Sequence, residues 1–228
     1  MTALNRTTFN KLLEVGPGGG ALTQHLIKLE NIDFKAVELD EEKVLYLQKT
    51  YPDLKDKLIL KSILDLAPPF EGDFTVIGNF PYNISSQILF KVLDWKEQVP
   101  SVFGMFQKEV AARIASKEGS KDYGILSVLI QAYYDVDYLF DVPPTSFNPP
   151  PKVMSGVIEL KRREKPEEVA SEKKFKLLVK TAFNQRRKML RNGVKGLFDP
   201  EFLKNDIFSK RAEQLSVADF AQLSFKMK

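Results

Sequence analysis

The chain has 228 residues, a length that suits one α/β domain with a smaller second domain, and 43% of its residues are hydrophobic. It has no cysteine, which excludes disulfides, thiolate catalysis and cysteine-ligated zinc. No apolar run is long enough to span a membrane, and residues 1–6 lack the apolar core of a signal peptide. We therefore expect a cytoplasmic protein without a membrane segment.

The formal net charge is only +4, but it is unevenly distributed. Residues 147–228 carry 19 Lys and Arg against 10 Asp and Glu, a net charge of +9, which leaves −5 on residues 1–146. Such asymmetry predicts an anionic partner for the C-terminal part of the chain. The alternative is a set of ordinary solvated helix faces, which charge alone does not exclude.

Strand-like apolar runs alternate with helical patterns before residue 161. The runs typical of strands are 12–16, 34–39, 58–61, 74–79, 101–107, 134–141 and 153–160. The helical patterns are 19–29, 41–50, 84–95, 107–117 and 122–132. This α/β alternation predicts a mostly parallel sheet with helices on both faces, and the short link between the last two strands predicts an antiparallel pair at one edge. Seven such strands resemble the Rossmann-like class I methyltransferase fold.

A charged segment without an apolar period, residues 162–171, separates this region from the rest of the chain. Beyond it the sequence is helical throughout, with helices expected at 172–183, 186–196, 200–208 and 216–226. We therefore predict two domains: residues 1–163, which hold the sheet, and residues 168–228, which form a small all-helical domain.

A glycine-rich turn, Glu14-Val-Gly-Pro-Gly-Gly-Gly20, follows the first expected strand. Its glycines let the chain turn sharply and bring bare backbone against a ligand. The helix that follows points free N–H groups into the same space, which favours an adenosine cofactor. Because Ala21 completes a G-x-G-x-x-A pattern, NAD stays open as the cofactor, as does a purely structural turn.

Two further strand exits could complete this cofactor site. Glu38, at the end of the second strand, can accept hydrogen bonds from both ribose hydroxyls of an adenosine cofactor. Asp40 is better placed as the N-cap of the next helix. In nucleoside-binding sheets, the end of the third strand often contacts the adenine edge of the cofactor. Ser62 stands there, and it is a weaker hydrogen-bond acceptor than an acidic residue would be.

The fourth strand exit reads Asn79-Phe80-Pro81-Tyr82. An adenine N6 amine is a poor nucleophile because its lone pair is delocalised into the ring. The Asn79 side-chain oxygen and the Phe80 carbonyl would accept its N–H groups and localise the lone pair. Pro81 would stiffen the loop, and Tyr82 would offer a stacking face. Catalysis would then be positioning and electrostatics. The alternative is a structural proline loop, and in either case we expect Asn83 to cap the next helix.

A second aromatic, Phe147, lies in the proline-stiffened loop 146–151. It could close over a flipped base from the side opposite Tyr82. The alternative is an aromatic that anchors the loop to the core.

The densest basic stretch, residues 183–192, reads Phe-Asn-Gln-Arg-Arg-Lys-Met-Leu-Arg-Asn. Arg187 and Arg191 stand at i,i+4 spacing, which predicts one exposed basic helix start suited to phosphate oxygens. Lys108 and Arg113 on an earlier helix could extend this surface. We predict no metal site.

Seven segments together resemble the KsgA-type (RsmA) ribosomal RNA small-subunit adenine N6-dimethyltransferase family. They are residues 13–18, 37–40, 78–85, 107–110, 123–128, 147–153 and 183–188. The Asn-x-Pro-Tyr motif alone would fit any N6-adenine methyltransferase, whereas the last two segments are far more specific.

The resemblance implies transfer of four methyl groups from S-adenosylmethionine to two adjacent adenosines in the 3′-terminal hairpin of 16S ribosomal RNA. The substrate would be an assembling small subunit, and we expect a monomer. Residues 1–163 would be the methyltransferase domain and 168–228 the rRNA-binding domain. The donor site would comprise Glu14, Gly16, Gly18, Glu38, Leu39, Ser62, Ile63 and Asn79. The catalytic residues would be Asn79, Phe80, Pro81, Tyr82 and Phe147. The RNA-binding residues would be Lys108, Arg113, Lys152, Arg186, Arg187, Lys188 and Arg191.

The sequence departs from the family pattern in two places. Family members usually have a Gln-His-Phe-Leu segment before the first strand that folds over the donor, and this chain has none. The family's acidic residue at the third strand exit is Ser62 here. Both departures predict weaker donor binding. The main alternative function is therefore a ribosome-assembly RNA-binding factor with weak or no catalysis. An NAD-dependent oxidoreductase is a further alternative, opposed by the aromatic loop after Asn79.

Overall fold

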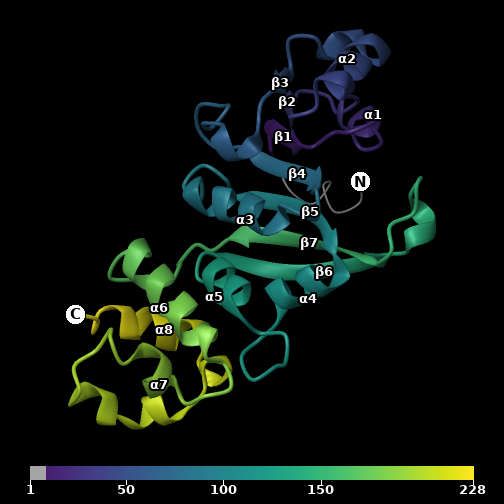
Figure 1. Ribbon diagram of the computed structural model, residues 1–228. Coiled ribbons are helices and arrows are strands. Elements are labelled where there is room, and N and C mark those ends of the chain that lie inside the picture. The colour runs from purple at the N-terminus through teal and green to yellow at the C-terminus, as the bar shows by residue number, and fades with distance from the viewer. Residues whose placement is uncertain (1–8) are drawn as a thin grey trace. The chain divides into compact units, whose positions relative to one another are not determined.

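The computed structural model describes residues 9–228 (Figure 1). Residues 1–6, on which the predicted lack of a signal peptide depends, lie outside the described residues. The strands are β1 Lys11–Val15, β2 Asp33–Glu38, β3 Leu58–Leu60, β4 Thr75–Asn79, β5 Ser101–Gln107, β6 Tyr134–Val142 and β7 Ser155–Arg162. The α-helices are α1 Thr23–Leu26, α2 Glu41–Thr50, α3 Ser85–Asp94, α4 Lys108–Ala115, α5 Ile125–Gln131, α6 Glu172–Asn184, α7 Leu190–Val194 and α8 Val217–Ser224. Within residues 9–228, none of these helices is both long and apolar enough to cross a membrane.

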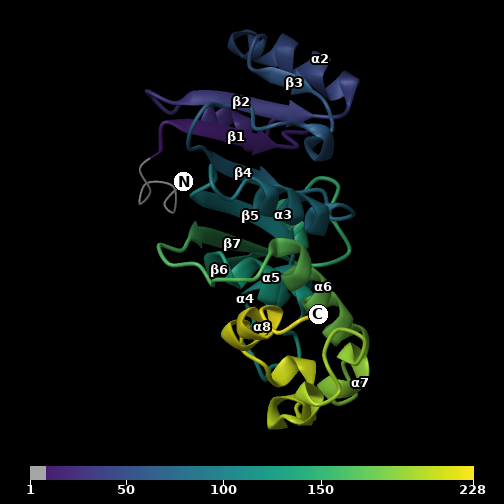
Figure 2. The same ribbon diagram turned by 90° about the vertical axis from the view of Figure 1, so that its left-hand side faces the viewer.

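The strands form one sheet in the order β3-β2-β1-β4-β5-β7-β6 (Figure 2). β1 pairs in parallel with β2 and β4, β2 pairs in parallel with β3, and β4 pairs in parallel with β5. β7 runs antiparallel to β5 and lies between β5 and β6. The predicted mostly parallel sheet is confirmed, and the last two strands of the chain, β6 and β7, are neighbours at one edge of it.

The central strands β1 and β4 are buried along most of their length, which is typical of parallel strands covered on both faces. They are neighbours in the sheet, although β2 and β3 lie between them along the chain. The strand order therefore reverses between β1 and β4. In open α/β sheets, ligands bind beside the carboxyl ends of the strands at such a switch point.

Three of the expected helices are interrupted by residues whose backbone is not helical. The segment 19–29 contains only α1, and the helix begins late because Gly20 has a positive φ angle of 83°, which a right-handed helix does not allow. The segment 200–208 consists of two 3₁₀ turns separated by the extended residue Asn205. The segment 186–196 is helical only in α7, because the extended Met189 forms a β-bridge with Arg211.

Residue contacts divide the chain into two compact units. Of the described residues, unit 1 contains 9–108 and 138–162, and unit 2 contains 109–137 and 163–228. Within unit 2, α5 packs against α6 and α8, and the Gly119 amide donates to the Glu213 carbonyl at 2.7 Å. The division of function between residues 1–163 and 168–228 stays a prediction.

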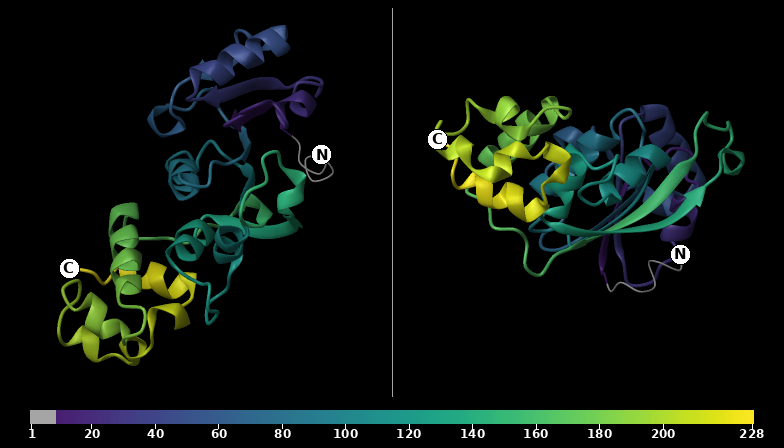
Figure 3. Two further views of the ribbon diagram at one scale, coloured as in Figure 1. Left: turned by 45° about the vertical axis from the view of Figure 1, so that its right-hand side comes forward. Right: turned by 90° about the horizontal axis from the view of Figure 1, so that it is seen from below.

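In unit 1, residues 143–154 connect β6 to β7 and include the short 3₁₀ helix Pro144–Ser146. This connection extends past the ends of the two strands (Figure 3). The Ser146 amide donates to the Pro143 carbonyl at 3.0 Å and the Phe147 amide to the Pro144 carbonyl at 3.1 Å. Residues 143–147 thus form a tight turn, which fixes the backbone that leads into Phe147.

Candidate functional site

The glycine turn after β1 lies against the loop after β4. Gly16 has a φ angle of +69°, and its amide donates to the Val37 carbonyl of β2 at 2.9 Å. A Cβ atom on Gly16 would stand 3.5 Å from Cδ of Pro81. Two motifs that are more than sixty residues apart in the sequence are therefore in close contact.

Glu38, at the carboxyl end of β2, is only 9% exposed. Its Oε2 accepts from the Gly18 amide at 3.1 Å, and its Oε1 accepts from the amides of Leu39 and Asp40 at 2.9 and 3.1 Å. The carboxylate therefore joins the end of β2 to the glycine turn.

Asp40 caps α2 as predicted. Its Oδ1 accepts from the amides of Glu42 and Lys43 at 3.0 and 3.3 Å. The hydrogen bond from the Lys43 backbone is the largest cause that lowers the pKa of Asp40 below its usual value. Asp40 thus serves the helix, which leaves Glu38 as the carboxylate at this strand exit.

Glu14, on β1, is 1% exposed, and its Oε2 accepts from Thr23 Oγ1 at 2.8 Å. Burial raises the pKa of Glu14 to about 7; the hydrogen bond from Thr23 opposes this shift and the nearby charge of Glu38 adds to it. Glu14 therefore changes its charge near neutral pH, beside the cavity described next.

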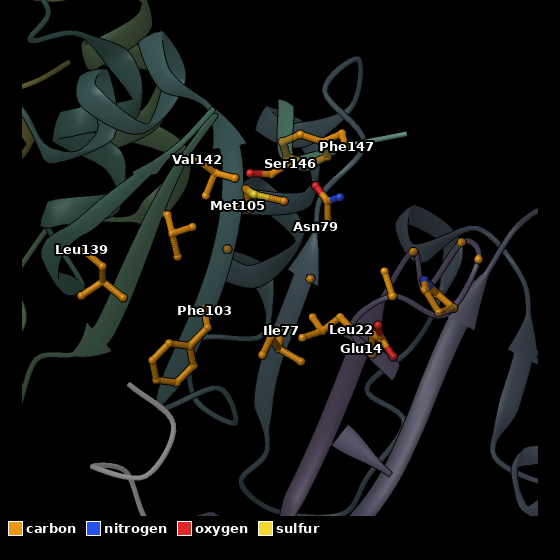
Figure 4. A pocket seen from close by; sticks show the side chains of 18 of the residues that line it. Glu14, Leu22, Ile77, Asn79, Phe103, Met105, Leu139, Val142, Ser146 and Phe147 are labelled. Carbon is orange, nitrogen blue, oxygen red and sulfur yellow. The ribbon is translucent and has the colours of Figure 1, made fainter. Parts of the chain in front are cut away.

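A cavity of about 640 Å³ opens at the carboxyl ends of β1, β4 and β5, within unit 1. Glu14 and Leu22 lie toward one end of it, and Asn79, Met105, Val142, Ser146 and Phe147 lie together at the other (Figure 4). The residues that line it are Glu14, Gly16, Pro17, Gly18, Gly19, Ala21, Leu22, Ile77, Gly78, Asn79, Phe103, Gly104, Met105, Leu139, Phe140, Val142, Ser146, Phe147 and Val157. The wall is thus mostly apolar, with a bare backbone turn and a few polar groups.

The cavity collects some of the predicted site residues. Glu14, Gly16, Gly18, Asn79 and Phe147 line it. The other predicted donor residues lie at the ends of β2 and β3, outside its lining; they are Glu38, Leu39, Ser62 and Ile63. Ser62 caps the 3₁₀ helix Ile63–Asp65 and accepts from the Leu64 amide at 3.2 Å.

Phe80 anchors the loop after β4. Its ring is 1% exposed and meets the Phe106 ring edge-on at 5.1 Å between centroids. Gly78 and Gly104 leave room for it, because a Cβ atom on either would stand 2.7 or 2.6 Å from the Phe80 ring. The Phe80 amide donates to the Met105 carbonyl at 3.2 Å. The buried ring therefore fixes the backbone on either side of it, and the predicted role of the Phe80 carbonyl stays a prediction.

Tyr82 is half-buried, and its hydroxyl lies 2.6 Å from Oγ of the fully buried Ser155 of β7. The predicted cap by Asn83 is wrong. The N-cap of α3 is Ile84, and no side chain caps this helix. The cause is a turn in which the Ile84 amide donates to the Pro81 carbonyl at 3.2 Å, so that Asn83 precedes the cap position.

Most of the predicted RNA-binding residues already have protein partners. Lys108 pairs with Asp141, and Arg113 pairs with Glu109 at 2.7 Å. Within unit 2, Arg186 donates to the carbonyls of Ser120 and Lys121, and Arg191 donates to the Phe208 carbonyl at 3.3 Å. Lys152, Arg187 and Lys188 are exposed.

The prediction that the basic stretch starts one helix is wrong. α6 ends at Asn184 and α7 begins at Leu190, so Arg187 lies in the turn between them. The Leu190 amide donates to the Lys210 carbonyl at 2.8 Å, which pulls this part of the chain into a short bridge. The i,i+4 spacing therefore does not place Arg187 and Arg191 on one helix face.

The apolar wall of the cavity was not predicted from the sequence. Met105 is the clearest case, because it stands opposite Asn79 in the β4–β5 register. The sequence does hold a signal for it. Residues that pair across two strands point to the same face of a sheet, so a residue near the end of the fifth expected strand should stand beside Asn79 at the end of the fourth.

A family model described as "Ribosomal RNA adenine dimethylase" matches residues 1–227. The chain is 52% identical over 221 residues to ribosomal RNA small subunit methyltransferase A of Cytophaga hutchinsonii, which covers 95% of this chain and 85% of that protein. It is 54% identical over 224 residues to the protein of the same name from Parabacteroides distasonis, covering 95% and 84%.

Two solved structures are similar in fold. A dimethyladenosine transferase from Plasmodium falciparum has a TM-score of 0.80 and 23% identity, over 95% of this chain and 89% of that one. The 23S rRNA methyltransferase ErmE has a TM-score of 0.64 and 22% identity, over 93% and 91%. At such identities the likeness shows the fold alone, and it confirms the predicted Rossmann-like class I methyltransferase architecture.

Proposed function

Because the chain belongs to the ribosomal RNA adenine dimethylase family, we propose that it dimethylates N6 of two adjacent adenosines in the 3′-terminal hairpin of 16S ribosomal RNA. The family, the enzyme class and the donor predicted from the sequence are confirmed: the chain is an RNA methyltransferase that depends on S-adenosylmethionine. Homologues of high identity carry the name of a methyltransferase, which does not favour the alternative of an assembly factor without catalysis. The observation that carries the proposal is the cavity shared by the glycine turn and Asn79.

The residues around the glycine turn fit the donor. The cavity runs along the bare backbone of Gly16 to Gly19, and a Cβ atom on Gly19 would meet nothing within 4 Å. Two buried carboxylates, Glu14 and Glu38, stand beside this turn and suit a ligand that carries positive charge and ribose hydroxyls. When bound, the donor supplies a methyl group on a positively charged sulfur, which is a good leaving group.

At the far end of the cavity, the loop after β4 would hold the target adenine. Asn79 would accept an N–H of the N6 amine and turn its lone pair toward the methyl group. Phe147, which lines the cavity, would stack on the base, and the half-buried ring of Tyr82, which lies in the same loop as Asn79 but outside the cavity lining, would close over its other side. No strong base is required, because the product amine can lose its proton to water. The chain's contribution is therefore position and electrostatics.

Exposed basic residues of each unit would contact the RNA: Lys152 in unit 1, and Arg187 and Lys188 in unit 2. Their charges suit phosphate oxygens. We further propose that the substrate is an assembling small subunit in the cytoplasm, and that the enzyme acts on it as a monomer.

Methyl transfer to small-subunit particles that lack the modification tests the proposal. Labelled S-adenosylmethionine and wild-type protein should yield N6-methylated adenine, identified after digestion to nucleosides. Asn79→Ala should lower the rate by about 100-fold, as expected when one key hydrogen-bond partner of the reacting group is removed. Asn83→Ala is the matched control, since Asn83 is an exposed asparagine of the same loop that caps no helix.

Two outcomes would contradict the proposal. Wild-type protein that binds the donor in calorimetry but labels no adenine would reject the reaction. Equal rates for Asn79→Ala and Asn83→Ala would reject the role given to Asn79.

A further inference from the structure

We propose that Met105, together with Val142, forms an apolar recess for the first methyl group on N6, and so determines that the product is dimethyladenine. This inference rests on the proposed function, because it concerns the second of two transfers to one nitrogen. It assigns a specificity role to a residue that carries no polar chemistry.

The strand registers place Met105 next to Asn79. Met105 stands opposite Asn79 in the parallel β4–β5 pair and opposite Val157 in the antiparallel β5–β7 pair. Residues opposite each other in a sheet point to the same face, and all three line the cavity. Figure 4 shows the Met105 side chain between those of Asn79 and Val142, with Ser146 and Phe147 at the same end.

The chemistry of the second transfer needs such a recess. After the first transfer, N6 carries one methyl group and one hydrogen. The lone pair must again face the donor, so the methyl group takes the place of one N–H that pointed at the protein. A methyl group cannot donate a hydrogen bond, and burying it against an unpaired polar atom is costly.

Met105 suits this task because its side chain is unbranched, apolar and adaptable. Val142 adds a second apolar side chain at the same end of the cavity. Asn79 would hold the remaining N–H while the methyl group lies on the Met105 thioether. In the second step the nitrogen lone pair forms the new N–C bond, the C–S bond of a fresh donor breaks, and sulfur keeps the bonding pair. N6 then loses its last proton to water.

The test compares Met105→Gln with Met105→Leu. Glutamine keeps the length of the side chain but places polar atoms in the recess, whereas leucine keeps it apolar. Particles lacking the modification are methylated to equal total label, digested, and analysed for N6-methyladenosine and N6,N6-dimethyladenosine. We expect Met105→Gln to raise the ratio of mono- to dimethyl product at least about tenfold, and Met105→Leu to stay within about threefold of wild type. Met154→Gln is the matched control, since Met154 is 37% exposed and does not line the cavity.

The experiment distinguishes a failure of the proposed function from a failure of the role given to Met105. Wild-type protein that forms no methyladenine overturns the proposed function and this inference together. Wild-type protein that dimethylates, with Met105→Gln giving the same product ratio, overturns only the role of Met105.

A second measurement covers the case in which Met105→Gln does not fold. In wild-type protein labelled with ¹³C at the methionine methyl groups, the Met105 signal is identified by its loss in Met105→Leu. Millimolar N6-methyladenosine should shift this signal, and should shift it more than adenosine does. Equal shifts with both nucleosides, or no shift with either, would overturn the proposal.

Discussion

The cavity of unit 1 and the basic segment 183–192 of unit 2 hold their polar side chains in different ways. Beside the cavity, two strand exits act together: Glu38, at the end of β2, accepts three backbone hydrogen bonds and fixes the glycine turn that lines the cavity. In the basic segment, neighbours differ: Arg186 is tied to two carbonyls, whereas Arg187 is exposed. Residues around a cavity can therefore be assigned one shared function, whereas each residue of a basic run must be assigned its own role from its own partners.

The largest expected effect concerns the buried ring of the Asn-x-Pro-Tyr loop. Phe80→Ala should lower the free energy of unfolding by about 3–5 kcal/mol, because the ring fills the space left by Gly78 and Gly104. Phe140→Ala, at a 55% exposed position, should cost far less. Urea denaturation followed by circular dichroism measures both. Similar losses for the two variants would show that the ring does not anchor the loop.

The next effect is a pH dependence due to Glu14. Its pKa rises from 4.5 to about 7 on folding, so the folded protein binds more protons than the unfolded chain in this interval. The stabilisation that depends on protonated Glu14 is fully present below pH 4.5. It is lost as the pH rises to 7, which lowers the free energy of unfolding by roughly 3 kcal/mol. Glu14→Gln should remove this loss. Unfolding free energies at pH 5 and pH 8 measure the difference, and parallel curves for both proteins would contradict the assignment.

The same titration should affect the donor. A cationic ligand binds better beside an ionised carboxylate, so S-adenosylmethionine should bind more tightly at pH 8 than at pH 6. Calorimetry at the two pH values checks this, with Glu14→Gln as the variant in which the change should vanish. A donor affinity that does not vary with pH in wild-type protein would place Glu14 away from the bound cation.

Arg186 and Arg187 should separate stability from RNA binding. Arg186→Ala should lower the free energy of unfolding by about 1–2 kcal/mol, because two carbonyls of unit 2 lose their donor. Arg187→Ala should change stability by less than about 0.5 kcal/mol but weaken RNA binding and reduce its salt slope by about 1. Denaturation and filter binding at several salt concentrations measure the two. A loss of stability in Arg187→Ala, with weaker RNA binding only in Arg186→Ala, would contradict both assignments.

The smallest effect concerns the contact between Tyr82 and Ser155. Ser155→Ala should cost about 1 kcal/mol, because the half-buried Tyr82 hydroxyl loses its partner. In a double-mutant cycle with Tyr82→Phe, the coupling energy should be about 1 kcal/mol. Strictly additive losses would mean that the hydrogen bond contributes nothing in solution.

The fold was predictable because its signals are local. Apolar runs of strand length, glycine turns and the Asp40 cap each act within a few residues, and α2 begins and ends where the pattern predicted. The errors at Asn83 and in the basic segment have a common cause. In both, a backbone hydrogen bond to a turn or to a distant segment decides where the helix begins, and no local pattern reports it.

The candidate site was only partly predictable. The polar and glycine residues of the cavity carry recognisable chemistry, whereas its apolar wall uses ordinary strand residues. Met105, Leu139 and Val157 come from three strands and meet only when β5, β6 and β7 are placed in order. Their role depends on sheet register, which hydrophobic pattern alone does not determine.

The Phe80 ring has a consequence for how this chain can change over evolutionary time. Glycine at 78 and at 104 makes the space that the ring occupies, and Phe106 and the Val15 backbone border the same space. A side chain at 78 would also meet the Val15 carbonyl oxygen at 2.6 Å, and one at 104 would clash with the Phe106 ring, so a smaller residue at 80 alone does not make room for either, and both glycines should resist substitution. Libraries that randomise the loop after β4 should therefore keep glycine at 78 and at 104, or they will sample mostly misfolded clones.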